Sequence, residues 1–557
     1  MAIGRRFQKR HIKILIWNYL KIKFLNSKFY KVFIFLFSLT FITWWSGIAG
    51  ASLYAIPSLL LVGFSIYAII KGQYFLIITK LYNNFKEWIS FQKYKKMILA
   101  IFALQSFLWF SYVILKYYSF NLFTLDAGYH SNILYNISNG DFFSSVFNMH
   151  NLGEHFTLSM SFIALFYKLV PSINWMMGFK IIAYLSSVYL IFLIIKDELK
   201  EYHKYWMVFI VFAVMWLFLY RPIINTVRYE FQASCLAPPF ILMSFLFLKK
   251  EKWIPFVFTM IFLLGFKEHL GSVWIGFGCY KILKNPRNIS GYIILMIGVL
   301  SIYLIMFEIK SYFRGTTSGY NDVNLIAPFK DVGEKIFYFL IYLLSPLMFL
   351  PLIFWKNGIM AMPAIGINLI SGVSQMYSSH YHYDDVASTL LIISTIISLK
   401  NLNIKFLFEK LKKYKIFQYG TILWLSLFLY YLPYSNLRFI KKVIPTSMHF
   451  ELINEINNVN KITKNKHIAV QGVLGSHFYR KEIQAYYQGV DCNYDNAFYK
   501  NSLPNPLPAY EYIILSAYVS QYGLKDYEKC LEQLNQSNKF IKLGNYKLLD
   551  VYQRIQS

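Results

Sequence analysis

Five clusters of titratable side chains in this chain combine residue types suited to acid–base, phosphate or metal chemistry. Carboxylates and imidazoles exchange protons and bind metal ions, and guanidinium or ammonium groups neutralise phosphates. The clusters are Asp126; Glu154 with His155; Arg228 with Glu230; Lys267, Glu268 and His269; and His380, His382, Asp384 and Asp385. All of them fall in gaps between apolar segments, where side chains from distant parts of a chain can meet.

Each cluster also has a purely structural interpretation. Asp126 could cap the following helix, and Glu154 could stand in the first turn of another. Arg228 could pair with Glu230 inside one loop. The segment 267–269 could be a short solvated turn, and the paired aspartates at 384–385 could be acids at a helix N-terminus. The His-x-His spacing is weak evidence for zinc. Gathered at one membrane face, however, the five clusters predict a site there.

Long apolar segments must position these clusters. The chain has 557 residues, of which 57% are hydrophobic. Several segments approach the roughly 20 residues that a helix needs to cross a bilayer: Val32–Gly50, Ala51–Ile70, Met97–Leu115, Asn174–Ile195 and Ile289–Phe307. Backbone polar groups cannot stay unpaired in lipid, so these segments are expected to be helices. The shorter Phe156–Val170 is expected to be interfacial or re-entrant.

The charge distribution predicts the topology. The net charge is +29, but most Lys and Arg residues lie in short loops between apolar segments, as the positive-inside rule requires. That pattern argues against nucleic-acid binding as the origin of the charge. It predicts about 13 transmembrane helices in the plasma membrane, with a cytoplasmic N-terminus and an extracytoplasmic C-terminus. All five clusters then lie on the outer face.

The same pattern predicts four parts of the chain. They are a basic cytoplasmic tail (1–31), an N-terminal transmembrane hairpin with a basic loop (32–96), a membrane core (97–435) with a large outer loop (116–155), and an extracytoplasmic α/β domain (440–557). In the last part, short strands are expected at His467–Val470, Tyr512–Leu515, Phe540–Leu543 and Tyr546–Val551, with a helix at Lys525–Ser537.

Four cysteines are present. Cys235 and Cys279 fall in apolar segments and are expected to be buried as small residues. Cys492 and Cys530 fall in the polar C-terminal part and could form a disulfide if that part is outside the cell. No cysteine spacing indicates a metal site.

The order of the motifs resembles the DUF2079 family of prokaryotic multi-pass membrane proteins over roughly residues 97–400. The run Asp126-Ala127-Gly128, followed by Asn136 and Gly140 and then by Gly153-Glu154-His155-Phe156, is similar to that family's opening. Tyr229-Glu230-Phe231, Lys267-Glu268-His269 and His380-Tyr381-His382-Tyr383 resemble its later segments. Two positions depart from the pattern: His269 stands where an acid is typical, and Gln232 where the family usually has His.

The family in turn resembles the GT-C glycosyltransferases. This likeness implies a membrane enzyme that moves a sugar from a polyprenyl-phosphate donor to an acceptor hydroxyl on a glycan, lipid or protein at the outer face. It implies Asp126 as catalytic base, with Glu154 and His155 flanking the acceptor or a metal. Arg228 and Lys267 would hold the donor phosphate, and the substrate-binding residues as a whole would be Arg228, Glu230, Lys267, Glu268, His380 and His382. No cofactor is fixed, and a divalent metal (Mg²⁺ or Mn²⁺) stays open.

Two other functions remain open on the sequence. A transporter or flippase of lipid-linked saccharides would place polar residues at the membrane midplane, and Gln105, Lys180 and Asn368 are the main candidates. A non-catalytic membrane protein would instead use its outer α/β domain for recognition.

Overall fold

The computed structural model describes the chain from residue 95 onward, with gaps. The described ranges are 95–200, 205–315, 329–378, 381–401, 443–478, 483–486, 510–519, 527–544 and 546–555. The basic tail and the helices expected from the apolar segments Val32–Gly50 and Ala51–Ile70 lie outside them. By its internal contacts the chain divides into two units, and the description below concerns the unit made of Gln105–Leu407 and Lys442–Ser557, together with the start of α5.

The described part of the chain is mostly helical. Its longer helices, in chain order, are α5 (Lys95–Tyr118), α6 (Tyr129–Ser138), α8 (Ser161–Leu169), α9 (Asn174–Glu198), α10 (Tyr205–Val214), α11 (Arg221–Arg228), α12 (Ala237–Lys249), α13 (Trp253–Leu264), α14 (Gly271–Lys284), α15 (Ile289–Tyr303), α20 (Met362–Ile370) and α21 (Asp385–Lys400). Short helical pieces α7 (Asn151–Glu154), α16 (Lys310–Arg314), α17 (Val332–Phe337), α18 (Leu350–Ile353) and α19 (Trp355–Gly358) connect them.

Two of the described helices are long and apolar enough to cross a membrane: α9, and the continuous run Ile289–Arg314 that joins α15 to α16. A third span results if Val208–Leu217 and Arg221–Arg228, which meet at a bend of 42°, are counted together. Large apolar side chains such as Ile254, Phe258 and Ile289 are mostly exposed, as expected where a helix faces lipid rather than water. The total of about 13 helices stays a prediction.

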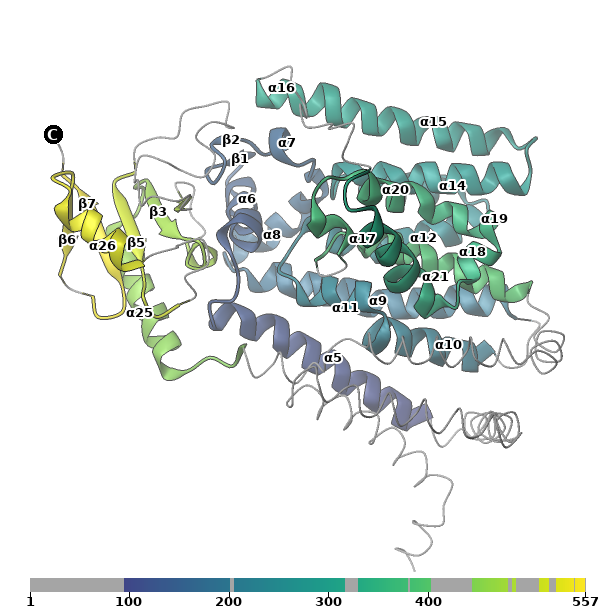
Figure 1. Ribbon diagram of the computed structural model, residues 1–557, viewed down its shortest axis with the longest axis horizontal. Coiled ribbons are helices and arrows are strands. Elements are labelled where there is room, and N and C mark those ends of the chain that lie inside the picture. The colour runs from purple at the N-terminus through teal and green to yellow at the C-terminus, as the bar shows by residue number, and fades with distance from the viewer. Residues whose placement is uncertain are drawn as a thin grey trace, which may run out of the picture. The chain divides into compact units, whose positions relative to one another are not determined.

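Helices α14 and α15 lie side by side (Figure 1). A Cβ atom on Gly278 would come within 2.6 Å of the backbone N of Leu295, and one on Gly298 within 2.7 Å of the backbone N of Ile275. Glycine is therefore needed at both positions for this close approach. Small residues at such crossings let membrane helices gain van der Waals contact that lipid does not already supply.

The charge pattern predicts an outer loop that carries Arg221, Arg228 and Glu230 and a second one over Glu308–Lys335, but the structure is helical in part of each. Arg221–Arg228 forms α11, with Pro222 in its first turn, where the fixed φ of proline favours a helix start. The loop predicted to begin at Glu308 begins later, because the helix continues through α16 to Arg314. Lys310 can stay on this helix while buried because its ammonium pairs with Glu268.

The apolar residues 336–354 predict one continuous helix, but the structure breaks this segment into separate pieces. Met348 and Phe349 have left-handed backbone angles (φ 52° and 56°), and α18 starts only at Leu350. Pro346 and Pro351 flank the break. Proline cannot donate the backbone hydrogen bond that a continuous helix requires, so apolar composition alone gave too long a helix here.

The C-terminal α/β region (443–555) contains a five-stranded sheet with strand order β4-β3-β5-β7-β6. Its elements are α25 (Ser447–Ile462), β3 (Ile468–Gln471), β4 (Ile483–Tyr486), β5 (Tyr512–Leu515), α26 (Tyr527–Gln536), β6 (Phe540–Leu543) and β7 (Asp550–Arg554). Strand β3 pairs in parallel with β4 and β5, whereas β7 pairs antiparallel with β5 and β6.

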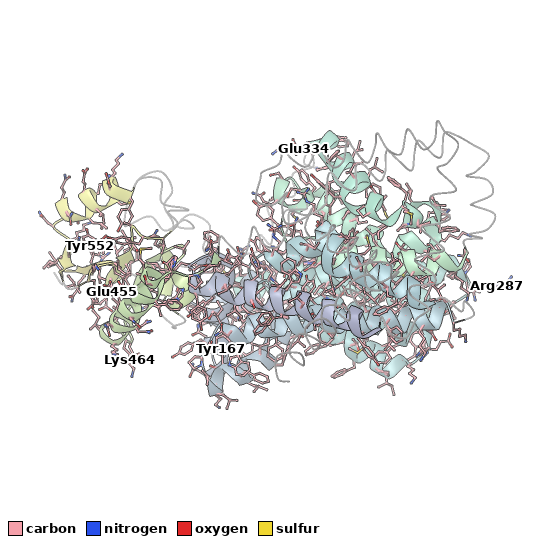
Figure 2. All side chains as sticks on the ribbon, turned by 90° about the horizontal axis from the view of Figure 1, so that it is seen from below. Tyr167, Arg287, Glu334, Glu455, Lys464 and Tyr552 are labelled. Carbon is pink, nitrogen blue, oxygen red and sulfur yellow. The ribbon has the colours of Figure 1, made fainter. Side chains whose placement is uncertain are left out.

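The last strand begins later than the sequence predicts, at Asp550 instead of Tyr546. The carboxylate of Glu455 on α25 accepts backbone hydrogen bonds from Lys547, Leu548 and Leu549 at 2.9 to 3.1 Å. These amides are thus taken from the sheet and held by the helix. Figure 2 labels Glu455 and, on the following strand, Tyr552.

Candidate functional site

Asp126 lies in a tight helical turn, η3 (Thr124–Gly128), a few residues after the end of α5. Its side chain is partly exposed, and both carboxylate oxygens accept hydrogen bonds. The hydroxyl of Tyr229 donates to Oδ2 at 2.7 Å, and the amide of Gln232 donates to Oδ1. Two donors from one distant segment therefore fix the orientation of a carboxylate that solvent or a substrate can still reach.

Glu230, between these two donors, holds the backbone of the turn. Its Oε2 accepts from the backbone N–H of Phe123 at 2.7 Å and from that of Ala127 at 3.5 Å. Burial, and then the negative charge of Asp126, raise the pKa of Glu230 to about 8. Both amides donate to the same oxygen, Oε2. A carboxyl group that is protonated on its other oxygen can still accept both bonds. Glu230 is therefore a positioning residue, and the salt bridge with Arg228 considered from the sequence is replaced by these contacts.

Two lysines hold the segment 228–230 from the neighbouring helices. Lys180 on α9 is fully buried, and its ammonium donates to the backbone carbonyls of Tyr229 (2.8 Å) and Glu230 (2.6 Å). Lys116 on α5 donates to the carbonyl of Arg228 at 3.1 Å. These carbonyls follow the end of α11, where backbone acceptors lack helical partners. The cations supply the missing donors.

Lys267 brings a positive charge to the same site. It is 7% exposed, and its ammonium donates to Oε1 of Gln232 at 3.4 Å and lies 5.8 Å from the ring centre of Tyr383. Nε2 of His130 also approaches Oε1 of Gln232 at 3.4 Å. Gln232 thus connects the carboxylate of Asp126 to a buried cation.

Burial raises the pKa of Asp126 above its ordinary value, although the bonds from Tyr229 and Gln232 and the charge of Lys267 oppose the rise. A carboxylate with a raised pKa is a stronger proton acceptor than one in water. The surroundings of Asp126 are therefore suited to a general base.

His382 adds an unusual imidazole beside Tyr229. It is 3% exposed, and neither ring nitrogen has a hydrogen-bond partner. Its ring lies 4.7 Å from that of Tyr229 and 4.1 Å from that of Tyr383. Burial, and then the charge of Lys267, lower its pKa well below the usual value. Since buried polar atoms normally have partners, His382 is the best candidate in this region for a side chain that awaits a ligand.

Glu268 is the centre of a second network. Its carboxylate contacts Nδ1 of His155 (3.1 Å), the backbone N–H of Phe156 (3.2 Å) and the buried ammonium of Lys310 (3.5 Å). Burial would raise the pKa of Glu268, but the charges of His155 and Lys310 hold it well below the ordinary value. Glu268 therefore favours the ionised form and links three segments of the chain.

Glu154 is tied to the same helix end. It pairs with Arg314 at 3.0 Å, both side chains being partly exposed. Lys310 and Arg314 are four residues apart on α16 and so share a face. Through its pairs with Glu154 and Glu268, α16 holds the loop that carries Glu154 and His155 near the turn after α13.

The predicted residues fall into three groups. The structure places Asp126, Glu230, Lys267 and His382 in one cluster, and Glu154, His155 and Glu268 in the α16 network. Arg228 bonds to Asn225 at 3.3 Å and interacts with Tyr112 on α5. His380 lies outside the described residues. Among the described residues, no group of three or more His, Cys, Asp or Glu side chains could hold a metal ion.

Sequence reasoning missed the partners that complete the site. Tyr229 and Gln232 stand on either side of Glu230, and Gln232 had been noted only as a departure from the family pattern. Lys310 interrupts a long apolar run. A buried charge in such a helix requires a partner, and that signal could have linked it to an acid.

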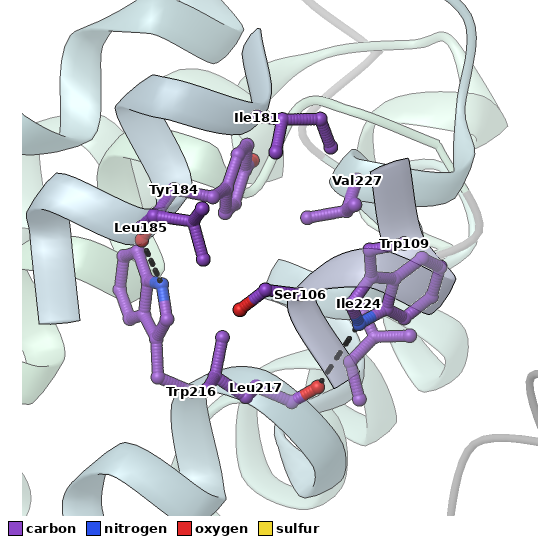
Figure 3. Close-up of a pocket in the computed structure, with 9 residues that line it drawn as sticks. All are labelled: Ser106, Trp109, Ile181, Tyr184, Leu185, Trp216, Leu217, Ile224 and Val227. Atoms are coloured by element: carbon purple, nitrogen blue, oxygen red, sulfur yellow. Dashed lines mark hydrogen bonds between the residues drawn. The ribbon is translucent and has the colours of Figure 1, made fainter. Parts of the chain in front are cut away.

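A small apolar pocket lies between α5, α9, α11 and the segment that follows α10 (Figure 3). Its lining residues are Ser106, Trp109, Ile181, Tyr184, Leu185, Trp216, Leu217, Ile224 and Val227. The indoles of Trp109 and Trp216 donate to the carbonyls of Leu217 and Tyr184, each at 3.3 Å. These bonds fix the rings that form opposite walls.

The chain belongs to the family described as "Predicted membrane protein (DUF2079)", whose model matches residues 116–541. The family resemblance seen in the motifs is thereby confirmed, and the protein is a membrane protein. No curated protein sequence matches the chain significantly.

Two solved structures are similar to this chain at 11% sequence identity, and each alignment covers 83% of this chain and 98% of the other. They are ArnT from Cupriavidus metallidurans bound to undecaprenyl phosphate (TM-score 0.47) and the same protein in the apo state (TM-score 0.46). At this level of similarity, the function has to be argued from the side chains of this chain.

Proposed function

We propose that this protein is a membrane glycosyltransferase that moves a sugar from a polyprenyl-phosphate donor to an acceptor hydroxyl at the outer face of the membrane. One observation carries the proposal. The partly exposed carboxylate of Asp126 is oriented by Tyr229 and Gln232, and Gln232 also binds the buried ammonium of Lys267. A proton acceptor and a cation that can receive negative charge are thus held at one place.

In the proposed reaction, the acceptor oxygen bonds to the anomeric carbon of the donor sugar, and the bond from that carbon to the phosphate oxygen breaks. The acceptor proton passes to Asp126. Polyprenyl phosphate leaves with the electron pair of the broken bond. A positioned general base contributes about 10²–10⁴-fold to such a step.

The leaving phosphate needs compensating charge, because negative charge develops on it in the transition state. Lys267 is the best-placed cation, since its hydrogen bond to Gln232 is long at 3.4 Å and can be exchanged for a phosphate oxygen. The unpartnered ring nitrogens of His382 supply a further donor beside it. Arg228 is less suited, since the guanidinium bonds to Asn225.

The orientation with the C-terminal α/β region outside the cell is part of the proposal. It is supported by the basic loops on the opposite side and by Cys530, which is disulfide-bonded, whereas Cys235 and Cys279 in the helical part are free. Disulfides persist mainly in oxidising compartments.

A transporter is not favoured by Lys180 and Asn368, two of the three polar residues named for it from the sequence. The ammonium of Lys180 is bonded to two backbone carbonyls, and the amide of Asn368 donates to the hydroxyl of Tyr338 and to the carbonyl of Tyr383. Both side chains therefore have partners inside the protein and stabilise it rather than offering a path for a substrate.

The test is transfer of labelled sugar from a panel of polyprenyl-phosphate donors in membranes that contain this chain. Asp126→Asn should abolish transfer, because the amide cannot accept the acceptor proton. Asp141→Asn, which removes an acid from the same outer loop, is the matched control and should retain it. Transfer by the Asp126→Asn variant would overturn the assignment of the base. Absence of transfer from every donor, with the protein correctly inserted, would overturn the proposed reaction.

A further inference from the structure

We propose that the loop Gly472–His477 of the C-terminal α/β region is a positioning element that holds the Asp126 turn in its active geometry. The inference rests on the proposed role of Asp126 as catalytic base. It assigns a catalytic contribution to a region that the proposed reaction does not otherwise use.

The loop occupies a special place in the sheet. Strand β3 is flanked by β4 on one side and β5 on the other, so the connections that follow β3 and β4 run in opposite directions across the sheet. Loops at the carboxyl ends of parallel strands at such a switch point form the usual binding crevice of α/β sheets. Gly472–His477 directly follows Gln471, the last residue of β3. Here the loop binds a part of its own chain.

The loop contacts the Asp126 turn at both ends. The backbone N–H of Thr124 donates to the carbonyl of Gly472 at 2.6 Å, and its hydroxyl donates to the same oxygen at 2.9 Å. A Cβ atom on Gly475 would lie 1.9 Å from the hydroxyl oxygen of Thr124, and one on Gly128 would lie 3.3 Å from the backbone of Gly475. The bare backbone of Gly475 thus packs directly against the side chain of Thr124, which leaves no room for a side chain at position 475.

Aromatic contacts fix the chain just before the turn. The ring of His477 stacks on Tyr117 (centroids 4.2 Å apart, planes at 18°) and on Phe120 (4.2 Å, 27°). Phe120 has a left-handed backbone (φ 55°) and is 1% exposed. A bulky residue in that conformation is strained and persists only where its surroundings impose it. The loop supplies part of those surroundings.

The turn is therefore held from two sides. Glu230 binds the amides of Phe123 and Ala127, and Gly472 binds the amide of Thr124 between them. The carboxylate of Asp126 itself is bonded to Tyr229 and Gln232 and to no residue of the loop. The loop thus acts through the backbone of the turn. Since a displacement of about 1 Å can cost 10²-fold in rate, loosening this contact should lower kcat.

Gly475→Ala is the test variant, because the added methyl group meets Thr124. Gly544→Ala is its matched control, since a Cβ there has no atom within 4 Å. Hydrogen exchange of the peptide containing residues 123–128 measures the contact directly. We expect exchange about tenfold faster in Gly475→Ala, with kcat about 10²-fold lower, KM little changed and Gly544→Ala like wild type. Unchanged exchange, or faster exchange with unchanged kcat, would overturn the proposal.

A rescue variant covers the case in which Gly475→Ala disturbs the whole fold. The three atoms nearest to the added Cβ all belong to the side chain of Thr124, so Thr124→Gly combined with Gly475→Ala restores the space. Because Thr124→Gly also removes the hydroxyl bond to Gly472, the double variant is compared with Thr124→Gly alone. Protection and kcat at the level of Thr124→Gly support the proposal, and values as low as those of Gly475→Ala overturn it. Hydrogen exchange does not depend on sugar transfer. If the wild-type protein transfers no sugar, the proposed reaction is refuted. The hydrogen-exchange comparison still tests whether the loop holds the turn.

Discussion

The hydroxyl of Tyr229 donates a 2.7 Å hydrogen bond to the carboxylate of Asp126 across 103 residues of sequence. This bond joins the segment after α11 to the turn after α5, and the adjacent Glu230 binds the backbone of that turn. The side chain and the main chain around Asp126 are thus positioned by neighbouring residues of one segment.

Tyr229→Phe should move the pH dependence of transfer. The hydrogen bond from Tyr229 lowers the pKa of Asp126, which burial raises, so its loss should raise that pKa further. The base acts when deprotonated. The acidic limb of kcat/KM should therefore shift to higher pH, with transfer at neutral pH falling about tenfold, as expected for about 1.4 kcal/mol, and recovering partly in alkali. The control Tyr135→Phe should leave the acidic limb unchanged. An unchanged limb in Tyr229→Phe would contradict the hydrogen bond from Tyr229 to Asp126.

Lys267→Met should lower kcat more than it raises KM. An ammonium that meets charge developing on the leaving phosphate acts mainly in the transition state, and losing one such donor costs about 10²–10³-fold. Lys168→Met, which removes an exposed lysine from α8, should leave transfer unchanged. A rise in KM alone would show that Lys267 only binds the donor in its ground state.

Lys310→Met and Arg314→Met should differ in their effect on stability, although the two residues are one helical turn apart. The Lys310–Glu268 pair is buried, and removing one partner of a buried pair costs about 3–5 kcal/mol. The Arg314–Glu154 pair is partly exposed and should contribute at most about 1 kcal/mol. Thermal unfolding in detergent should show a clear loss of Tm for Lys310→Met only. Equal shifts would contradict the network described around Glu268.

His477→Phe should weaken the response of stability to acid. Burial lowers the pKa of His477 from 6.5 to about 3. Between these two pH values the unfolded chain is therefore protonated at His477, whereas the folded chain is not. This contribution to stability is complete above pH 6.5 and is lost as the pH falls from 6.5 towards 3. Phenylalanine keeps the stacking but does not titrate. The loss of Tm between pH 7.5 and pH 5 should be smaller than in wild type, and the same as wild type in the control His467→Phe.

The disulfide of Cys530 is predicted to join Cys492. Peptide mass spectrometry without reduction should find the two linked, while Cys235 and Cys279 react with thiol reagents after unfolding. Cys530→Ser should lower the Tm. If the region behaves like a small secreted domain, its free energy of unfolding should fall by about 2–5 kcal/mol. Detection of Cys492 and Cys530 as free thiols would argue against an outer location of this region.

The sequence predicted what depends on local pattern. Apolar runs correctly indicated α9 and α15, and the strands expected at Tyr512–Leu515 and Phe540–Leu543 are confirmed with the same bounds. It missed α25, although Thr446 caps it and Leu452, Ile456 and Val459 repeat at helical spacing on its buried face. A mixed Asn-rich surface obscured that period.

What the sequence could not give is the pairing of distant residues. The sequence predicts Asp126 as the catalytic base. No local pattern, however, indicates that Gln232 binds its carboxylate or that Gly472 binds Thr124 in the same turn. The role of Glu268 in substrate binding stays a prediction, but no local pattern indicated its contacts with His155 and Lys310, which come from two other segments. Such contacts depend on how helices pack, which hydrophobic periodicity does not encode. The assignment of Arg228 to the donor likewise stays a prediction.

Strand β7 follows every other strand in the chain but lies inside the sheet, between β5 and β6. Until it is in place, both neighbours expose an unpaired edge, and such edges invite association with other chains. The five-stranded sheet therefore cannot be complete until β7 has been synthesised. A nascent chain interrupted shortly before Asp550 would have β3, β4 and β5 but would leave β5 and β6 with unpaired edges. Such a chain would be more prone than the finished protein to associate with other chains.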